Sequence, residues 1–186
     1  AYAEGNKYHA IFGSNKCYIV HPSDIAVALL ALDAVVCVSS ATGTKDIPVS
    51  EFYVLPETNV HVETVLEPGE FVSKVKIPKP SSVSKSIYVK VKERQAYDFA
   101  LSSVAISVEL RNGTIKKARV ALGGVAPIPY SIPHVNAELI GKNIADLDAH
   151  SIGQLAVRGA KPLSENHYKV QLTASTVARA VAELFN

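Results

Sequence analysis

Few side chains of this 186-residue sequence stand where their type and setting suggest chemistry. Asp24 follows Ser23 at the start of an apolar run, where a carboxylate either caps a helix or binds the hydroxyl group of a ligand. Lys90 lies in a strand-like segment, where a solvated lysine on the outer face is the ordinary interpretation. Gly123 and Gly124 close another strand-like segment, where a tight turn or close packing is more typical than a phosphate cradle. Asp24 and Lys90 are therefore candidate binding residues, and we assign no ligand to the two glycines.

The sequence contains none of the GxGxxG, Walker, GxSxG and HExxH motifs that mark common enzyme sites. Its six histidines include no pair at metal-ligand spacing on one predicted face, and its two cysteines form no CxxC pair. Cys37 lies in an apolar run and is predicted to be a buried strand cysteine. His21, which precedes Pro22, suits fixing a turn as well as contacting a ligand. We therefore predict no catalytic residue and no metal ligand. A hydrolase would need a nucleophile and a base that the sequence does not mark.

The composition excludes some classes of partner. Nineteen basic and seventeen acidic residues leave a net charge of +2, which gives no reason to expect a nucleic acid or an anionic membrane as partner. A hydrophobic content of 48% predicts a buried core. No apolar stretch approaches the ~20 residues that a membrane span needs, and no signal peptide opens the chain. We expect a cytoplasmic location, with the periplasm as the alternative. Residues 1–7 lack Met and any entry signal for a helix or strand, as in a piece of a longer polypeptide.

The elements expected before residue 78 mix helix and strand. A helix-like apolar pattern follows Pro22, with Ser23 or Asp24 as its N-cap and an end near Asp33. A turn is expected over residues 40–44, where small and polar residues cluster. Strands are expected at Val35 to Ser39, at Ile47 to Phe52, running into a short helical turn, and at Phe71 to Ile77.

A linker is expected at residues 78–82, where two prolines and two serines separate apolar segments of different character. We place a domain boundary there, giving domains at residues 1–78 and 79–186. Beyond it an Asn-Gly turn at Asn112-Gly113 predicts a hairpin. Strands are expected at 86–91, 100–110 and 115–122, and helices at 136–140, 144–157 and 165–185, the last capped by Ser164. The fold class is therefore α+β, with an antiparallel sheet packed on a helical bundle after a mixed unit.

Short motifs recur in a fixed order along nearly the whole chain. They are Tyr8-His9-Ala10-Ile11-Phe12-Gly13, His21-Pro22-Ser23-Asp24, 28–34, Glu67-Pro68-Gly69-Glu70-Phe71-Val72, Ile77-Pro78, Lys90, Arg94, 96–100, 118–127 and 162–170. Together they resemble the FAD-binding (medium) subunit of the xanthine dehydrogenase, aldehyde oxidoreductase and CO dehydrogenase family of molybdenum hydroxylases. Each motif alone is weak, and their joint order carries the resemblance.

The resemblance implies a fold, a cofactor and partners. Residues 1–78 would be the remainder of a flavin-binding α+β subdomain, and residues 79–186 a CO dehydrogenase flavoprotein-like C-terminal domain. FAD would lie between subdomains and take electrons from [2Fe-2S] clusters, which are reduced by a molybdenum cofactor. Both of those centres would sit on partner subunits, and the terminal acceptor would be NAD⁺, oxygen or a carrier protein.

Three flavin contacts of the family fall on matching positions. The resemblance places Asp24 near the ribityl and phosphate part of FAD, Val72 against the isoalloxazine ring and Lys90 beside that ring. A cation beside the ring would stabilise negative charge on the reduced flavin. The family's glycine-rich pyrophosphate segments have no counterpart here, so the chain would supply one wall of the site.

Two further interpretations bear on which cofactors this chain can hold. Cys17 and the Tyr8-His9-Ala10 stretch resemble the branch of the family that carries an inserted [4Fe-4S] cluster, but one cysteine cannot hold a cluster and we assign no metal. In the alternative to an electron-transfer role, residues 79–186 dock partner subunits and the fragment binds no cofactor by itself.

Overall fold

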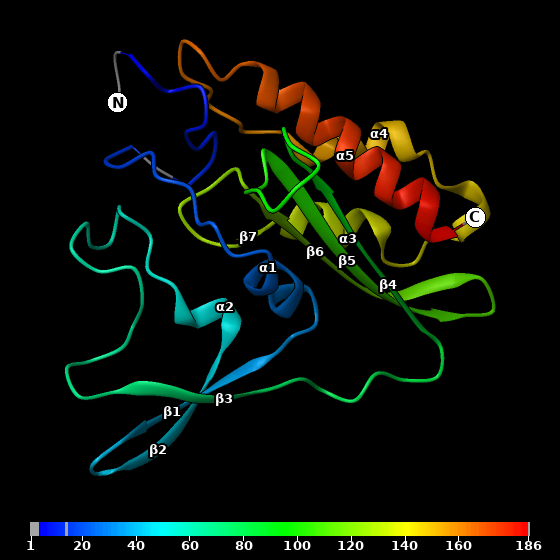
Figure 1. Cartoon of the computed structure of the whole chain (residues 1–186). Coiled ribbons are helices and arrows are strands. Elements are labelled where there is room, and N and C mark those ends of the chain that lie inside the picture. The colour runs from blue at the N-terminus through cyan, green and yellow to red at the C-terminus, as the bar shows by residue number, and fades with distance from the viewer. Residues whose placement is uncertain (1–3, 14, 186) are drawn as a thin grey trace.

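The computed structural model describes residues 4–13 and 15–185, which fold around two antiparallel sheets (Figure 1). The first sheet has three strands in the order β2-β1-β3, and the second has four in the order β4-β5-β6-β7. The strands are β1 Val35–Ser40, β2 Gly43–Pro48, β3 Phe71–Lys76, β4 Ser84–Val91, β5 Ser102–Arg111, β6 Thr114–Gly123 and β7 Tyr130–Ser131. The helices are α1 Asp24–Ala31, α2 Val49–Phe52, α3 Pro133–Leu139, the 3₁₀ helix η1 Ile144–Asp146, α4 Ala149–Ala156 and α5 Tyr168–Phe185.

The four-stranded sheet carries helices on both faces, and residues 102–106 of its central strand β5 are therefore all buried. On one face Val104 and Ile106 join the main core with Val177 of α5. On the other face the intervening Ala105 packs with Val27 of α1, whose close approach the small side chain permits. The helices α3, α4 and α5 lie together over the first face and α1 lies over the second (Figure 1).

The three-stranded sheet has a small core of its own. Val36 and Val38 of β1 pack with Val49 and Phe52 of α2, and Cys37 is also buried, as predicted. Every residue of the edge strand β3 is exposed. This sheet therefore buries far less side-chain surface than the four-stranded sheet.

The residues that precede the first sheet pack on the second. Ile11 and Phe12 belong to the main core, and α1 contacts β5 and β6. In Figure 1 the N-terminal segment runs beside the start of α5. The chain thus begins on the four-stranded sheet, crosses to the three-stranded one and returns through residues 77–83, which form no helix or strand. A domain boundary within that stretch stays a prediction.

The expected α+β class and antiparallel order of elements are confirmed, while some bounds were wrong. The last helix begins at Tyr168, so Ser164 is too far away to cap it. The Ser164 hydroxyl accepts from the Asn6 side-chain amide instead, and Asn166, which lies between, accepts from Leu163 N. The turn expected over residues 40–44 is shorter, because Ser40 of β1 already pairs with Gly43 of β2 and only residues 41 and 42 lie between the strands. The expected helix 144–157 is split, since Asp148 caps α4 separately from η1.

Candidate functional site

Asp24 and Lys90, separated by 66 residues in sequence, form an ion pair. Lys90 Nζ lies 2.5 Å from Asp24 Oδ2 and also donates to the Asp98 carbonyl oxygen at 2.6 Å. The Lys90 side chain is only 20% exposed, so the interpretation of a solvated lysine was wrong. Ser23 supplies the N-cap of α1 by accepting from Ala26 N at 3.1 Å. Because Ser23 caps the helix, the Asp24 carboxylate is left for the lysine.

Tyr88 completes this pair from the same strand as Lys90. Its hydroxyl donates to Asp24 Oδ1 at 2.8 Å, so both carboxylate oxygens of Asp24 are engaged. Burial raises the pKa of Tyr88 well above its usual range, which keeps the phenol a neutral donor. The strand β4 thus presents a hydroxyl and an ammonium to one carboxylate at the start of α1.

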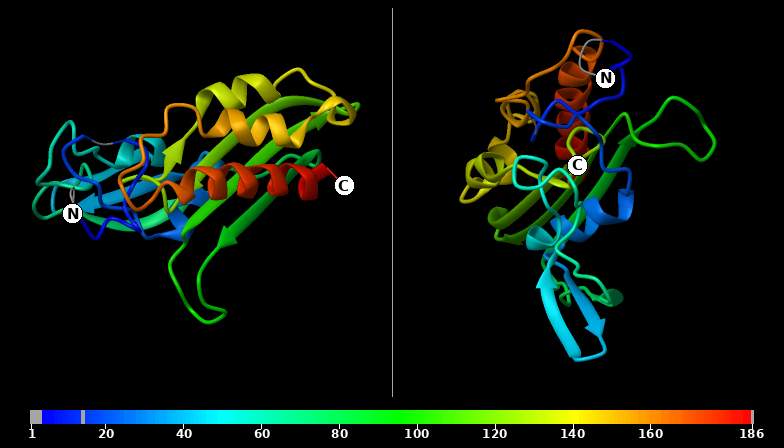
Figure 2. Two further views of the ribbon diagram at one scale, coloured as in Figure 1. Left: turned by 90° about the horizontal axis from the view of Figure 1, so that it is seen from above. Right: turned by 90° about the vertical axis from the view of Figure 1, so that its left-hand side faces the viewer.

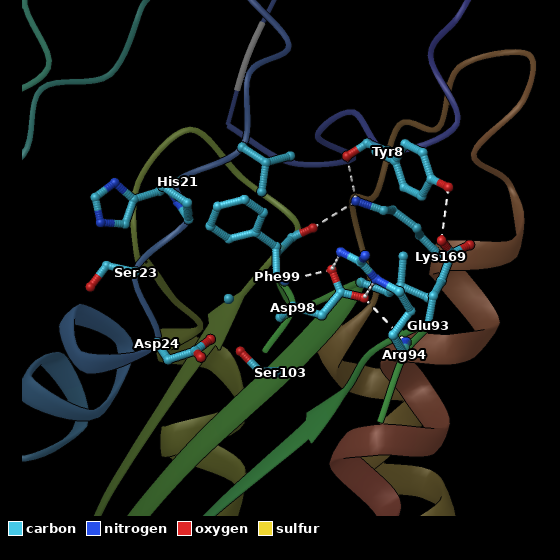
Figure 3. A pocket seen from close by; sticks show the side chains of 16 residues that line it. Tyr8, His21, Ser23, Asp24, Glu93, Arg94, Asp98, Phe99, Ser103 and Lys169 are labelled. Carbon is cyan, nitrogen blue, oxygen red and sulfur yellow. Dashed lines mark hydrogen bonds and ion pairs between the residues drawn. The ribbon is translucent and has the colours of Figure 1, made fainter. Parts of the chain in front are cut away.

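A cavity of about 640 Å³ opens beside Asp24. It lies between the N-terminus of α1, the segment that joins β4 to β5, and the neighbouring ends of β5 and β6 (Figure 3). Its lining combines apolar and polar groups: Tyr8, Val20, His21, Pro22, Ser23, Asp24, Glu93, Arg94, Asp98, Phe99, Ala100, Leu101, Ser103, Gly123, Gly124 and Lys169. Such a mixture is typical of sites that hold organic molecules.

Two neighbouring strands supply the floor of the cavity, which Ser103 of β5 and Gly123 of β6 line directly opposite each other. Lys90 stands opposite Ser103 on β4 but does not itself line the cavity, and it reaches the site through Asp24. A Cβ atom at Gly123 would meet Ser103 Oγ at 2.5 Å and Val27 Cγ2 at 2.6 Å, so only glycine fits. Gly124 has a φ of +74°, which favours glycine as well. The predicted close packing of the two glycines is confirmed.

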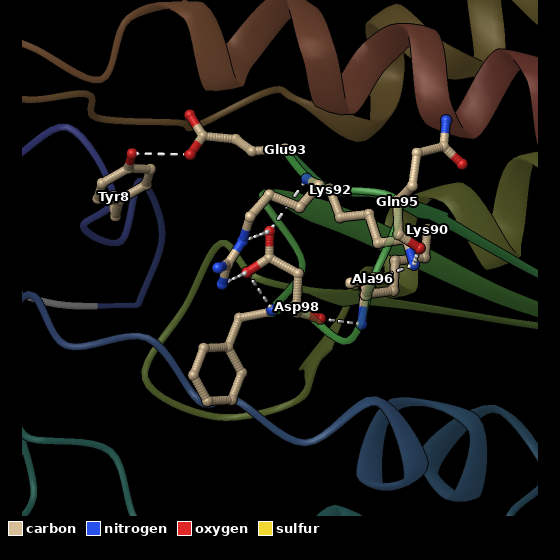
Figure 4. A network of polar contacts seen from close by, with 9 residues as sticks. Tyr8, Lys90, Lys92, Glu93, Gln95, Ala96 and Asp98 are labelled. Carbon is tan, nitrogen blue, oxygen red and sulfur yellow. Dashed lines mark hydrogen bonds and ion pairs between the residues drawn. The ribbon is translucent and has the colours of Figure 1, made fainter.

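The segment between β4 and β5 forms one wall and is held by contacts within itself (Figure 4). Lys92 Nζ donates to the carbonyl oxygens of Gln95 at 3.1 Å and Ala96 at 3.0 Å. The Arg94 guanidinium pairs with Asp98 and holds the pKa of that carboxyl below its usual range. The segment projects from the sheet (Figure 2), and Tyr97 near its tip is 93% exposed.

Lys169 of α5 closes the opposite wall. Its ammonium donates to the carbonyl oxygens of Tyr8 and Gly124, each at 2.7 Å, and the residue is only 1% exposed. Burial lowers the pKa of Lys169 to about 8. The Tyr8 hydroxyl donates in turn to Glu93 Oε2 at 2.9 Å. Lys169 therefore joins the N-terminal segment to the end of β6, while Tyr8 joins it to the wall formed by residues 92–100.

Two buried side-chain polar atoms among residues 4–13 and 15–185 have no hydrogen-bond partner, and both belong to residues that line the cavity. They are His21 Nε2 and Ser103 Oγ. The His21 ring stands edge-on to Tyr53 at 4.7 Å between centroids, and burial lowers its pKa. Unpartnered polar atoms are costly to bury, so their gathering at one cavity points to a ligand there.

Val72, the third predicted flavin contact, lies away from the Asp24–Lys90 ion pair. Val72 lies on β3 of the other sheet, opposite Val38, and is 43% exposed. It is not among the residues that line the cavity. The structure therefore brings together Asp24 and Lys90 but not Val72.

Sequence reasoning missed the roles of Ser103 and Lys169. Lys169 belongs to the motif at residues 162–170, but lysine is so seldom buried that its position on a helix gave no sign of its two carbonyl partners. Ser103 stands beside Ser102 in an apolar strand, and two adjacent serines there point to opposite faces. One of two such serines must face away from the core side that the other faces, and this pattern could have marked Ser103 as a candidate.

Neither a metal centre nor a membrane span is found in the part of the chain that the structure describes. No group of three or more His, Cys, Asp or Glu side chains there could hold a metal ion. No helix there is long and apolar enough to cross a bilayer.

Two family models match this chain side by side. Residues 7–80 match the FAD binding domain in molybdopterin dehydrogenase, and residues 87–184 match the CO dehydrogenase flavoprotein C-terminal domain. Among curated proteins, the aldehyde oxidoreductase FAD-binding subunit PaoB of Escherichia coli is 39% identical over 96% of this chain and 53% of its own length. The glyceraldehyde dehydrogenase medium chain of Sulfolobus acidocaldarius is 35% identical over 67% of this chain and 42% of its own.

Solved structures share the fold. CO dehydrogenase from Oligotropha carboxidovorans matches with a TM-score of 0.74 and 21% identity, covering 87% of this chain and 56% of that one. Quinoline 2-oxidoreductase from Pseudomonas putida 86 matches with a TM-score of 0.71 and 23% identity, covering 97% of this chain and 59% of that one. The chain spans about half the length of these relatives.

Proposed function

This chain belongs to the FAD-binding subunits of the molybdenum hydroxylase family, and we propose that it forms one wall of a flavin site in an electron-transfer subunit. Electrons would arrive from [2Fe-2S] clusters and leave for a terminal acceptor. The molybdenum cofactor and the clusters would sit on partner subunits. The observation that carries the proposal is the Asp24–Lys90 ion pair beside a ligand-sized cavity.

The residues around the cavity fit the ring end of a flavin. Its volume of about 640 Å³ falls within the range of small-molecule sites. Phe99 and Leu101 offer apolar surface for a flat aromatic ring, and Ser103 Oγ offers an unused hydrogen-bonding group. The pyrophosphate has no glycine-rich segment in this chain, so we assign its contacts to none of these residues.

FAD, when bound, supplies the capacity to accept and release electrons. Lys90 would hold a positive charge beside the ring, which favours the reduced and more negative state of the flavin. Asp24 positions that ammonium through the 2.5 Å ion pair, and Tyr88 positions Asp24. We propose Val72 as an apolar contact from the other sheet, and a domain boundary between residues 78 and 79.

Replacing Lys90 by Gln tests the proposed function. Loss of the cation should lower the reduction potential of bound flavin by about 30 mV or more, since 30 mV corresponds to about 1.4 kcal/mol for two electrons. A potentiometric titration of the purified subunit measures the shift. Lys85→Gln is the matched control, because Lys85 is exposed on the same strand. Equal potentials in the wild type and Lys90→Gln would contradict the role of Lys90.

The second candidate is a docking module that binds no cofactor by itself. The observation that favours it is Tyr97, which is 93% exposed on a projecting segment braced by its own ion pair. Titration of the chain with FAD, followed by flavin fluorescence, separates the two candidates. Saturable micromolar binding would exclude the docking module, and its absence in the complete subunit would exclude the flavin site.

A further inference from the structure

Ser103 stands at the point where β5 meets the floor of the cavity. In the sheet register it lies directly between Lys90 on β4 and Gly123 on β6. Directly opposed residues of antiparallel strands point to the same face, so the Ser103 and Lys90 side chains share the face that α1 covers. Figure 3 shows the Ser103 hydroxyl rising from the strand toward the side of the cavity that holds Asp24.

The Ser103 hydroxyl has no hydrogen-bond partner although the residue is only 1% exposed. The neighbouring Tyr88 hydroxyl gives its single proton to Asp24 Oδ1. Ser103 lies close enough to Tyr88 to act against the rise in the Tyr88 pKa, but the two hydroxyls do not meet in hydrogen-bond geometry. Gly123, on the other side, has no side chain to offer. A buried hydroxyl without a partner is unfavourable, and apolar alanine would avoid the cost. The serine is therefore better explained by a partner that the chain itself does not supply.

We propose that Ser103 is a ligand-binding residue whose hydroxyl hydrogen-bonds an oxygen or nitrogen atom at the ring end of the flavin. The inference rests on the proposed function, which puts the ring beside Lys90, the direct neighbour of Ser103 across the strands. Gly123 keeps the position accessible, because a Cβ atom there would lie 2.5 Å from Ser103 Oγ. The row Lys90, Ser103 and Gly123 thus combines a cation, a hydroxyl and an open backbone.

The inference predicts opposite effects on folding and on binding. Ser103→Ala removes an unsatisfied buried hydroxyl, so the flavin-free protein keeps or raises its urea midpoint of unfolding. The same change removes a hydrogen bond to the flavin, so the dissociation constant for FAD rises by about three- to tenfold. A serine with a purely structural role would lower the midpoint of unfolding and leave the affinity unchanged.

Ser102→Ala is the matched control. Ser102 is the adjacent buried serine of β5, but it faces α5 and bonds to Thr173 at 3.0 Å. Its loss leaves the Thr173 hydroxyl without this partner, so the unfolding midpoint should fall while the FAD affinity stays at the wild-type value. Ser103→Ala should therefore weaken FAD binding without lowering stability, and Ser102→Ala should lower stability without weakening FAD binding.

The experiment uses the full subunit with the chains it assembles with, stripped of flavin and titrated with FAD. Fluorescence gives the dissociation constant, the absorption maximum of bound oxidised flavin reports the ring's hydrogen bonds, and urea unfolding without FAD gives stability. A weaker affinity with a shifted band in Ser103→Ala supports the inference. If Ser103→Ala binds FAD as tightly as the wild type, the inference about Ser103 is wrong and the proposed function is unaffected. No FAD binding by the wild type overturns the proposed function and the inference together.

Discussion

At the scale of the residue, the two lysines beside the cavity differ in how their charge is balanced. Lys90 is partly exposed and faces a carboxylate, Asp24, at 2.5 Å. Lys169 is buried, and its ammonium donates to the uncharged carbonyl oxygens of Tyr8 and Gly124. The family resemblance singled out Lys90, but burial of Lys169 depends on contacts made by residues 161 and 45 positions away in sequence. No local pattern carries that information.

Replacing Lys169 by Met tests its burial through pH. Burial lowers the pKa of Lys169 to about 8, below its value of about 10.5 in an unfolded chain. Between these values the unfolded chain binds more protons, so the free energy of unfolding of the wild type rises with pH. Relative to Lys169→Met, that rise should reach at most about 3 kcal/mol. Urea unfolding at several pH values from 7 to about 10.5 measures it.

The control for this comparison is Lys116→Met, which removes an exposed lysine of β6. Its difference in free energy of unfolding from the wild type should not change over the same pH range, because the Lys116 side chain is in contact with water before and after unfolding. A constant difference between the wild type and Lys169→Met would show that Lys169 titrates normally.

At the scale of the element, local patterns identified the strands and helices better than their ends. The Asn-Gly turn and the alternation of Val104, Ile106 and Val108 identified the β5–β6 hairpin, since both signals are local. The segment before α5 is held instead by Asn166, whose side chain accepts from Leu163 N and donates to the His9 carbonyl oxygen 157 residues away. Contacts with such a distant segment leave no local signature. Helix ends were therefore the least predictable part of the fold.

Gly153 tests the packing of α4 on α5. In an exposed helix Gly→Ala gains about 1 kcal/mol, but here the new Cβ would lie 2.3 Å from the Ala174 carbonyl oxygen. The steric conflict outweighs helix propensity, because backbone on a packed helix cannot move aside without cost. Gly153→Ala should therefore lower the free energy of unfolding by about 1–3 kcal/mol. Thermal or urea unfolding measures it.

Gln154→Ala provides the comparison for this substitution. Gln154 is exposed at the next position of α4, so its replacement should change stability by no more than about 0.5 kcal/mol. If Gly153→Ala instead raised stability, the close approach of α4 and α5 would be wrong.

At the scale of the whole molecule, the order of motifs predicted the fold class and the family, whereas the cavity could not be predicted. Its walls come from the N-terminal segment, α1, the β4–β5 segment and α5. Such a meeting of distant segments depends on tertiary packing. The linker at residues 78–82 was visible in the composition, but the packing of α1 on the second sheet was not. A boundary in sequence therefore need not separate two cores in space.

Cleavage of the linker tests this last point. A specific protease site inserted between Lys79 and Pro80 lies in an exposed stretch without helix or strand, so it should be cut readily. The two pieces should stay together, because Ile11 and Phe12 belong to the same core as the β5 and β6 side chains and α1 packs on those strands. We expect one peak in gel filtration under native conditions and two in denaturant. Uncut protein carrying the same insertion is the control. Separation of the pieces on the native column would mean that residues 1–78 and 79–186 are independent units.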